Sequence, residues 1–174
     1  MRLDLPKEVR LTLVDDPEET ASRPRGLGKK DEENPERLYQ KIQKMTVAEK
    51  IKLATLGNKE ARAILLREAN KQILLAVIHS PKITESEVEA ISSSRSMPEE
   101  VLREIAKQKD WIRNKRIVSN LVKNPKTPLD ISLHFLPRLD TRELRELARS
   151  KNIPTALRTA VIRLLEQRTQ QRKR

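Results

Sequence analysis

The pattern of apolar and polar residues changes at Asn34. From there onward, apolar residues recur every three or four positions in short segments, which is the periodicity of amphipathic helices. Capping residues, prolines or a glycine separate the segments, so the pattern predicts about nine helices of two to three turns. Among them are 59–69, which ends before Asn70, and 111–124, which Pro125 closes.

Helix starts are marked most clearly by pairs with the spacing of a capping box, in which two residues bond each other reciprocally. The three pairs are Thr46 with Glu49, Thr84 with Glu87, and Asp140 with Glu143. Gly57 is a natural helix stop after the first of them. Residues 9–14 alternate apolar and polar side chains, which fits a short strand, although a disordered segment is favoured there.

Two corners of the chain share a sequence, "SPKIT" at 80–84 and "NPKTP" at 124–128. We expect the proline to end one helix and the hydroxyl of Thr84 or Thr127 to cap the next. Capping does not explain Lys82 and Lys126, because a cation just before a helix opposes the helix dipole. Each lysine is either a solvated turn residue or the neighbour of a bound anion.

The corners belong to a longer internal repeat, in which residues 73–111 match 117–152 at an offset of 42 to 44 residues. Short helices at regular spacing predict a stacked array of repeats. The run "GNKEARAILLREANK … SPKIT … SRSMPEEVLREIA … NPKTPL … LARSKNIP" resembles the HEAT-like and leucine-rich-repeat-variant α-solenoids of bacteria, over residues 45–165. The resemblance implies an all-α, short, right-handed α-solenoid, to which the prolines and acidic run of residues 1–33 add a flexible N-terminal arm. It implies no activity.

The predicted organisation has three parts. Residues 1–33 form an arm that is disordered or docked on a partner, 34–168 form the helical repeat domain, and 169–174 form a basic tail. The chain has three aromatic residues and no cysteine, so the core is built from aliphatic side chains, and disulfides and thiolate sites are excluded. No apolar stretch approaches the length of a membrane span or a signal peptide, and we expect a cytoplasmic protein without a membrane partner.

The net charge of +12 is unevenly distributed. Residues 1–45 hold ten basic and ten acidic residues, whereas 46–174 hold 27 basic and 15 acidic residues. The whole excess therefore lies in the part predicted to fold, which favours an electropositive surface over a basic tail. Within 111–124, Arg113, Arg116, Asn120 and Lys123 would fall on one helical stripe.

Stacked repeats would align such stripes into a ladder that fits a phosphate backbone. The predicted nucleic-acid-binding residues are Lys82, Arg113, Arg116, Lys123, Lys126, Arg138, Arg142, Arg145, Arg149 and Lys151. Few aromatic residues are present for stacking on bases, so structured nucleic acid read by shape is favoured, with RNA favoured over DNA. A surface that only keeps the helices in solution is the simplest alternative.

Two other functions stay open. The chain could be an adaptor whose concave face binds an acidic protein partner, or a HEAT-like DNA glycosylase built on Asp110 and Trp111. The second is disfavoured because one indole cannot build an aromatic cradle for a base. The two histidines without cysteine cannot close a zinc site by themselves. We expect no enzymatic activity, no cofactor, no metal and no small-molecule substrate.

Overall fold

The computed structural model describes residues 35–172, which fold into ten α-helices and two short 3-10 helices without strands. The α-helices are α2 (Pro35–Gln43), α3 (Val47–Leu56), α4 (Lys59–Leu65), α5 (Lys71–Ile78), α6 (Glu85–Ser93), α7 (Glu99–Lys107), α8 (Lys115–Lys123), α9 (Leu129–Phe135), α10 (Thr141–Arg149) and α11 (Thr155–Arg172), and the 3-10 helices are η2 (Trp111–Arg113) and η3 (Leu136–Arg138). The predicted all-α class is confirmed for this part of the chain. The arm at 1–33 and the strand at 9–14 lie outside the described residues.

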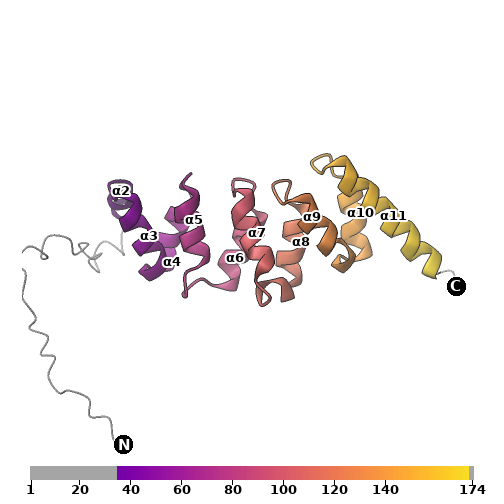
Figure 1. The fold of residues 1–174 in the computed structure, drawn as a ribbon, viewed down its shortest axis with the longest axis horizontal. Coiled ribbons are helices and arrows are strands. Elements are labelled where there is room, and N and C mark those ends of the chain that lie inside the picture. The colour runs from indigo at the N-terminus through magenta and orange to yellow at the C-terminus, as the bar shows by residue number, and fades with distance from the viewer. Residues whose placement is uncertain (1–34, 173–174) are drawn as a thin grey trace, which may run out of the picture.

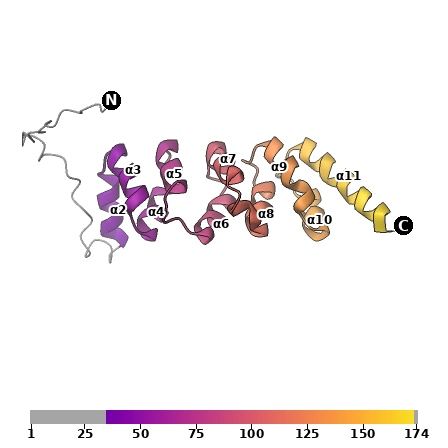
Figure 2. The same cartoon turned by 60° about the horizontal axis from the view of Figure 1, so that its bottom comes forward.

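The helices form an elongated array of pairs, α2 with α3 through to α10 with α11 (Figure 1). One row runs through α3, α5, α7, α9 and α11, in which α3 packs on α5, α5 on α7, and α9 on α11. The second row runs through α2, α4, α6, α8 and α10, in which α2 packs on α4 and α6 on α8. A turned view shows the same succession along the array (Figure 2).

The core follows the array as two adjoining aliphatic clusters. Helix α5 belongs to both, because Ile73 and Val77 face the N-terminal cluster while Leu74 and Ile78 face the C-terminal one. Residues four apart share a helix face and adjacent residues do not, so one apolar helix can cover two neighbours. This explains why "ILLAVI" reads as an uninterrupted apolar run.

The structural repeat differs from the repeat predicted from the sequence. Three blocks of fifteen residues, 84–98, 114–128 and 140–154, each contain a cap, a nine-residue helix and a turn that ends in proline. Their fourth helical residue is buried in each case: Val88, Val118 and Leu144. Successive blocks start 30 and 26 residues apart, rather than 42 to 44. The predicted offset was wrong because it aligned α5 of one row with α8 of the other.

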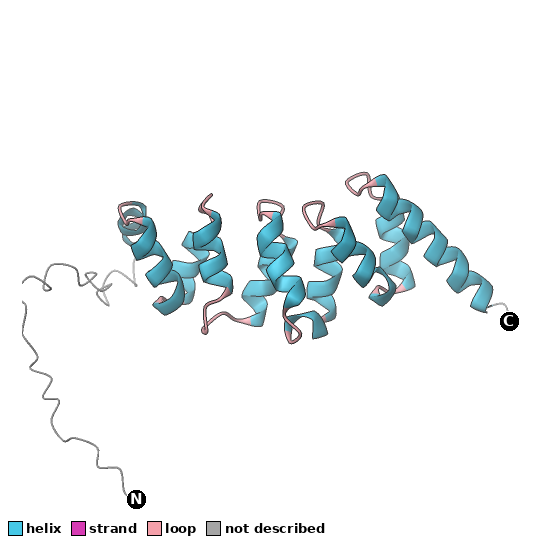
Figure 3. Cartoon of the chain, in the orientation of Figure 1, coloured by secondary structure: helices cyan, strands magenta, loops and turns pink. Residues whose placement is uncertain are grey.

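The two proline corners consequently lie at opposite edges of the array. Residues 80–84 join α5 to α6 at the lower edge in Figure 3, and 124–128 join α8 to α9 at the upper edge. Thr84 caps α6 in a capping box with Glu87, as predicted. Thr127 does not cap α9, because Pro128 holds the cap position and the buried Thr127 hydroxyl has no hydrogen-bond partner among the described residues. Thr127 fills the position that Met97 and Ile153 fill in the other blocks.

The remaining helix ends follow the predicted signals with small differences. All three capping boxes are present. Gly57 ends α3 with an ordinary φ of −68°, so its role is spatial: a Cβ there would lie 2.5 Å from the Leu53 carbonyl oxygen. Helix α4 ends at Leu65, four residues before the predicted end, and α11 continues to Arg172, into the segment predicted as a tail.

Candidate nucleic-acid interface

The predicted stripe of 111–124 is divided between two helices. Trp111–Arg113 form η2, and α8 begins only after Asn114, whose Oδ1 accepts a hydrogen bond from the Arg116 backbone N–H at 2.8 Å. An asparagine cap lies outside helical geometry, so the chain changes direction between the two helices. Arg113 is therefore not part of the α8 stripe, and its guanidinium lies 3.4 Å from the Asp110 carboxylate.

The second row of helices brings five of the predicted cations together on α8 and α10. In the fifteen-residue blocks, Arg116 and Arg142 both occupy the second helical position, and Lys123 and Arg149 both occupy the last. Arg145 lies one turn before Arg149 on α10. Two successive blocks thus repeat the same pair of basic positions, one at each end of the helix.

Carboxylates accompany three of these cations. Arg116 lies 3.6 Å from Glu89 on α6, and Lys123 lies 3.6 Å from Glu143 on α10. Arg142 and Lys123 share Glu146, at 3.3 and 3.7 Å. For Arg145 and Arg149 no carboxylate partner is found among residues 35–172.

Among the carboxylates beside these cations, Glu143 makes the most hydrogen bonds to the protein. Burial alone would raise the pKa of its carboxyl, but hydrogen bonds from the Ser119 hydroxyl and the Asp140 backbone, with Lys123 nearby, hold this pKa below its ordinary value. Glu143 therefore stays ionised at neutral pH and ties α8 to α10. Lys123 has the lowest exposure of the predicted cations, at 37% of its side chain, and two carboxylates of α10 lie beside it. It is therefore the predicted cation that contributes most to the packing of the helices.

Two of the predicted cations, Lys82 and Arg138, lie in connections at the lower edge and are also held by the protein. The Lys82 ammonium donates to the Leu56 carbonyl oxygen at 3.0 Å, which explains a lysine at that corner without a bound anion. The Arg138 guanidinium lies over the Phe135 ring, 5.7 Å from its centre. Arg113 and Arg138 line one small hollow of about 150 Å³ with Lys115.

At the upper edge, Lys126 and Lys151 are exposed and lack a carboxylate partner in the described chain. Two further exposed cations, Arg67 and Arg95, occupy turns at this edge and were missed by the sequence analysis. The signal that would have found Arg95 is the shared proline at 98, 128 and 154, which places Arg95, Lys126 and Lys151 two or three residues before it.

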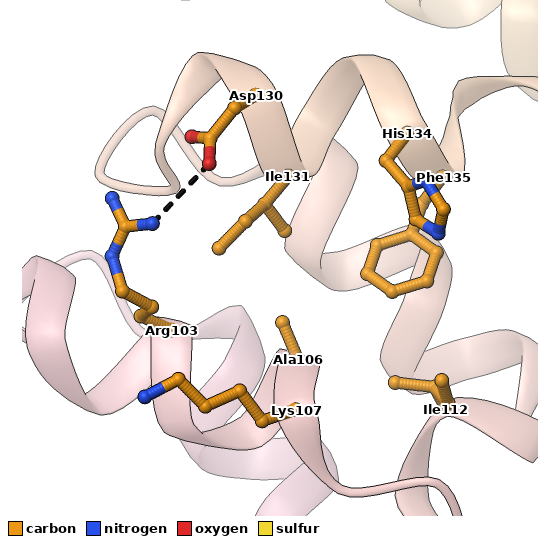
Figure 4. A pocket seen from close by; sticks show the side chains of 8 residues that line it. All are labelled: Arg103, Ala106, Lys107, Ile112, Asp130, Ile131, His134 and Phe135. Carbon is orange, nitrogen blue, oxygen red and sulfur yellow. Dashed lines mark hydrogen bonds and ion pairs between the residues drawn. The ribbon is translucent and has the colours of Figure 1, made fainter.

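A larger hollow of about 400 Å³ lies between α7 and α9 (Figure 4). Ala106, Ile112, Ile131 and Phe135 give it an apolar lining, and Arg103, Lys107, Asp130 and His134 surround them. Arg103 donates to Asp130 across the opening at 3.2 Å and to Glu99 at 2.8 Å. Lys107 pairs with Glu104 at 2.5 Å, so the hollow combines apolar surface with a rim of paired charges.

Neither of the residues considered for catalysis lines either hollow. Trp111 is half-buried against the core cluster, and Asp110 is largely exposed beside Arg113. Within the described residues, no three His, Asp or Glu side chains gather as a metal site would require. The same residues contain no helix with the length and apolarity needed to cross a bilayer.

Comparisons of this chain with models of protein families, with curated proteins and with solved structures find no significant match. The resemblance to HEAT-like and leucine-rich-repeat-variant proteins therefore stays a prediction.

Proposed function

We propose that this protein is a right-handed, HEAT-like α-solenoid without enzymatic activity that binds the phosphate backbone of structured nucleic acid, preferentially RNA. Support for the solenoid comes from the array of helical pairs and from the three blocks of equal length within it. Cytoplasmic localisation and a bacterial origin are part of the same proposal.

The observation that carries the binding function is the repeated basic pair on α8 and α10. Arg116 and Lys123 on one helix correspond to Arg142 and Arg149 on the next, and Arg145 adds a further charge between the last two. Lys123 on α8 reaches Glu143 and Glu146 on α10, so the equivalent basic side chains of the two helices form a short ladder. Arginine predominates in this ladder, and its planar fork suits phosphate oxygens.

The carboxylates beside the ladder do not prevent phosphate binding. The side chains of Arg116 and Arg142 are 80% and 89% exposed, and exposed ion pairs contribute little free energy. A phosphate can therefore replace Glu89 or Glu146 as the partner. Release of counterions from the nucleic acid would then supply most of the affinity and make it depend on salt.

The test is a fluorescence-anisotropy titration of the full chain with labelled 20-base-pair RNA and DNA duplexes between about 50 and 200 mM salt. Arg145→Gln/Arg149→Gln should weaken binding and reduce the slope of log K against log salt by about 2. Lys59→Gln/Lys109→Gln removes the same charge from exposed residues away from the ladder and should leave the slope unchanged. Absence of wild-type binding at the lowest salt would refute the proposed function.

The hollow between α7 and α9 favours a second candidate, an adaptor for an acidic protein partner. Leu133, on the same helix α9, is 38% exposed. Arg103 and Lys107 pair with carboxylates of the protein in exposed ion pairs, and acidic side chains of a partner could replace these carboxylates. A partner captured equally well after nuclease treatment, and lost with Leu133→Glu, would favour the adaptor. Capture that disappears with nuclease would favour nucleic-acid binding.

A further inference from the structure

The upper edge of the array carries one exposed cation in each of its five turns. These turns join the second-row helix of each pair to the first-row helix, and they follow α2, α4, α6, α8 and α10 (Figures 1 and 3). Their exposed cations are Lys44, Arg67, Arg95, Lys126 and Lys151. We call these five residues the turn-edge strip.

The charges of the strip are not used by the fold. For all five, the residues that the structure describes offer no salt-bridge or hydrogen-bond partner to the side chain. The turns at 94–98, 124–128 and 150–154 contain no acidic residue. Across all five turns the one carboxylate is Glu68, between α4 and α5, and it pairs with Lys50 at 2.7 Å.

The opposite edge provides an internal comparison. There, Lys82 donates to the Leu56 carbonyl, Arg113 pairs with Asp110, and Arg138 lies over Phe135. Lys109 is the exception, and it precedes Asp110 directly. Turn cations therefore have partners within the protein at one edge of the array, with the exception of Lys109, and lack them at the other.

We infer that the turn-edge strip is a binding surface for the backbone of an RNA duplex that extends over the whole array, including its N-terminal half. The inference rests on the proposed function and enlarges its site from α8 and α10 to all five pairs. Neighbouring helices about 10 Å apart give the strip a length of roughly 40 Å. A-form RNA rises by about 2.8 Å per base pair, so this length corresponds to about 14 base pairs, or somewhat more than one helical turn.

A straight strip can contact a helical backbone because a groove presents phosphates of both strands. Lysine and arginine have long flexible stems, so their charged groups can reach either side of the groove. Double-stranded RNA is recognised largely through its shape and phosphates, which suits a surface without exposed aromatic stacking residues in the strip. Each cation engaged should add about 0.9 to the salt slope.

The experiment compares Arg67→Gln/Arg95→Gln with Lys59→Gln/Lys109→Gln on a 20-base-pair RNA duplex. Both double variants remove two positive charges from exposed side chains without a partner in the described chain, so far-UV circular dichroism and Tm should match wild type. We expect Arg67→Gln/Arg95→Gln to bind about tenfold more weakly and to reduce the salt slope by about 2. The control pair should do neither, and wild-type affinity should fall for RNA duplexes shorter than about 14 base pairs.

The outcomes separate the two proposals. If Arg145→Gln/Arg149→Gln weakens binding while Arg67→Gln/Arg95→Gln does not, the surface is confined to α8 and α10 and the turn-edge strip is refuted. If Arg67→Gln/Arg95→Gln and the control Lys59→Gln/Lys109→Gln weaken binding equally, only the total charge matters and the turn-edge strip is likewise refuted. If the wild-type chain binds neither duplex, the proposed function itself fails.

Discussion

The ion pair between Arg62 and Glu87 offers the sharpest test of how the helical pairs are held together. Arg62 on α4 donates through Nε and Nη2 to the two carboxylate oxygens of Glu87 on α6, both at 2.9 Å. The side chains are 3% and 7% exposed. Glu87 also accepts from the Thr84 backbone N–H and hydroxyl, so one carboxylate caps α6 and joins two neighbouring pairs.

Glu87→Gln removes the charge and keeps the shape, and glutamine can still serve in a capping box. The substitution leaves the Arg62 guanidinium buried without a counter-charge. Breaking a buried pair in this way costs about 3–5 kcal/mol. We expect the free energy of unfolding to fall by about 3 kcal/mol, which is about two decades in the folding equilibrium constant.

Urea denaturation followed by circular dichroism measures this change, with Glu49→Gln as the matched control. Glu49 holds the same capping-box position in α3 and accepts from Thr46, but it has no arginine partner. If Glu87→Gln is no more destabilising than Glu49→Gln, the buried ion pair does not stabilise the contact between α4 and α6. The double variant Arg62→Met/Glu87→Gln should lose less than the sum of the two single losses, because the two residues are coupled.

Three further predictions concern packing and pH. Thr127→Val should raise the free energy of unfolding by about 1 kcal/mol, because the buried hydroxyl lacks a partner among residues 35–172. The control Thr84→Val removes a hydroxyl that caps α6, and it should lower the free energy of unfolding in the same urea assay. Gly57→Ala should cost about 1–3 kcal/mol through the contact with the Leu53 carbonyl, and an unchanged urea midpoint would contradict the spatial role of this glycine. Burial would raise the pKa of Glu87, but hydrogen bonds from Arg62 and Thr84 outweigh it and hold this pKa below its ordinary value. The stabilisation is therefore present above the pKa of the unfolded chain and is lost as pH falls through the pKa of the folded protein. Urea titrations between about pH 7 and pH 3 should therefore show a shallower acid loss in Glu87→Gln than in wild type.

Local features of the sequence predicted the helices well. A capping box needs only two residues three positions apart, and all three predicted boxes are present. The cap at Asn114 was available in the sequence, but the apolar periodicity of 111–124 concealed the break between η2 and α8. Periodicity describes which faces are apolar, and two short helices in succession can share a period.

The sequence by itself therefore determined the all-helical class and the positions of most helix starts, since both depend on neighbours within a few positions. It also determined the concentration of positive charge after residue 45, which follows from composition alone. Tertiary structure decided which residues share an edge and which cations are occupied. Lys82 and Lys126 have nearly identical surroundings in sequence, yet one donates to a carbonyl 26 residues away and the other is exposed at the opposite edge. The physical reason is that the pairing of a surface charge depends on helices that are distant along the chain, and local sequence carries no record of them.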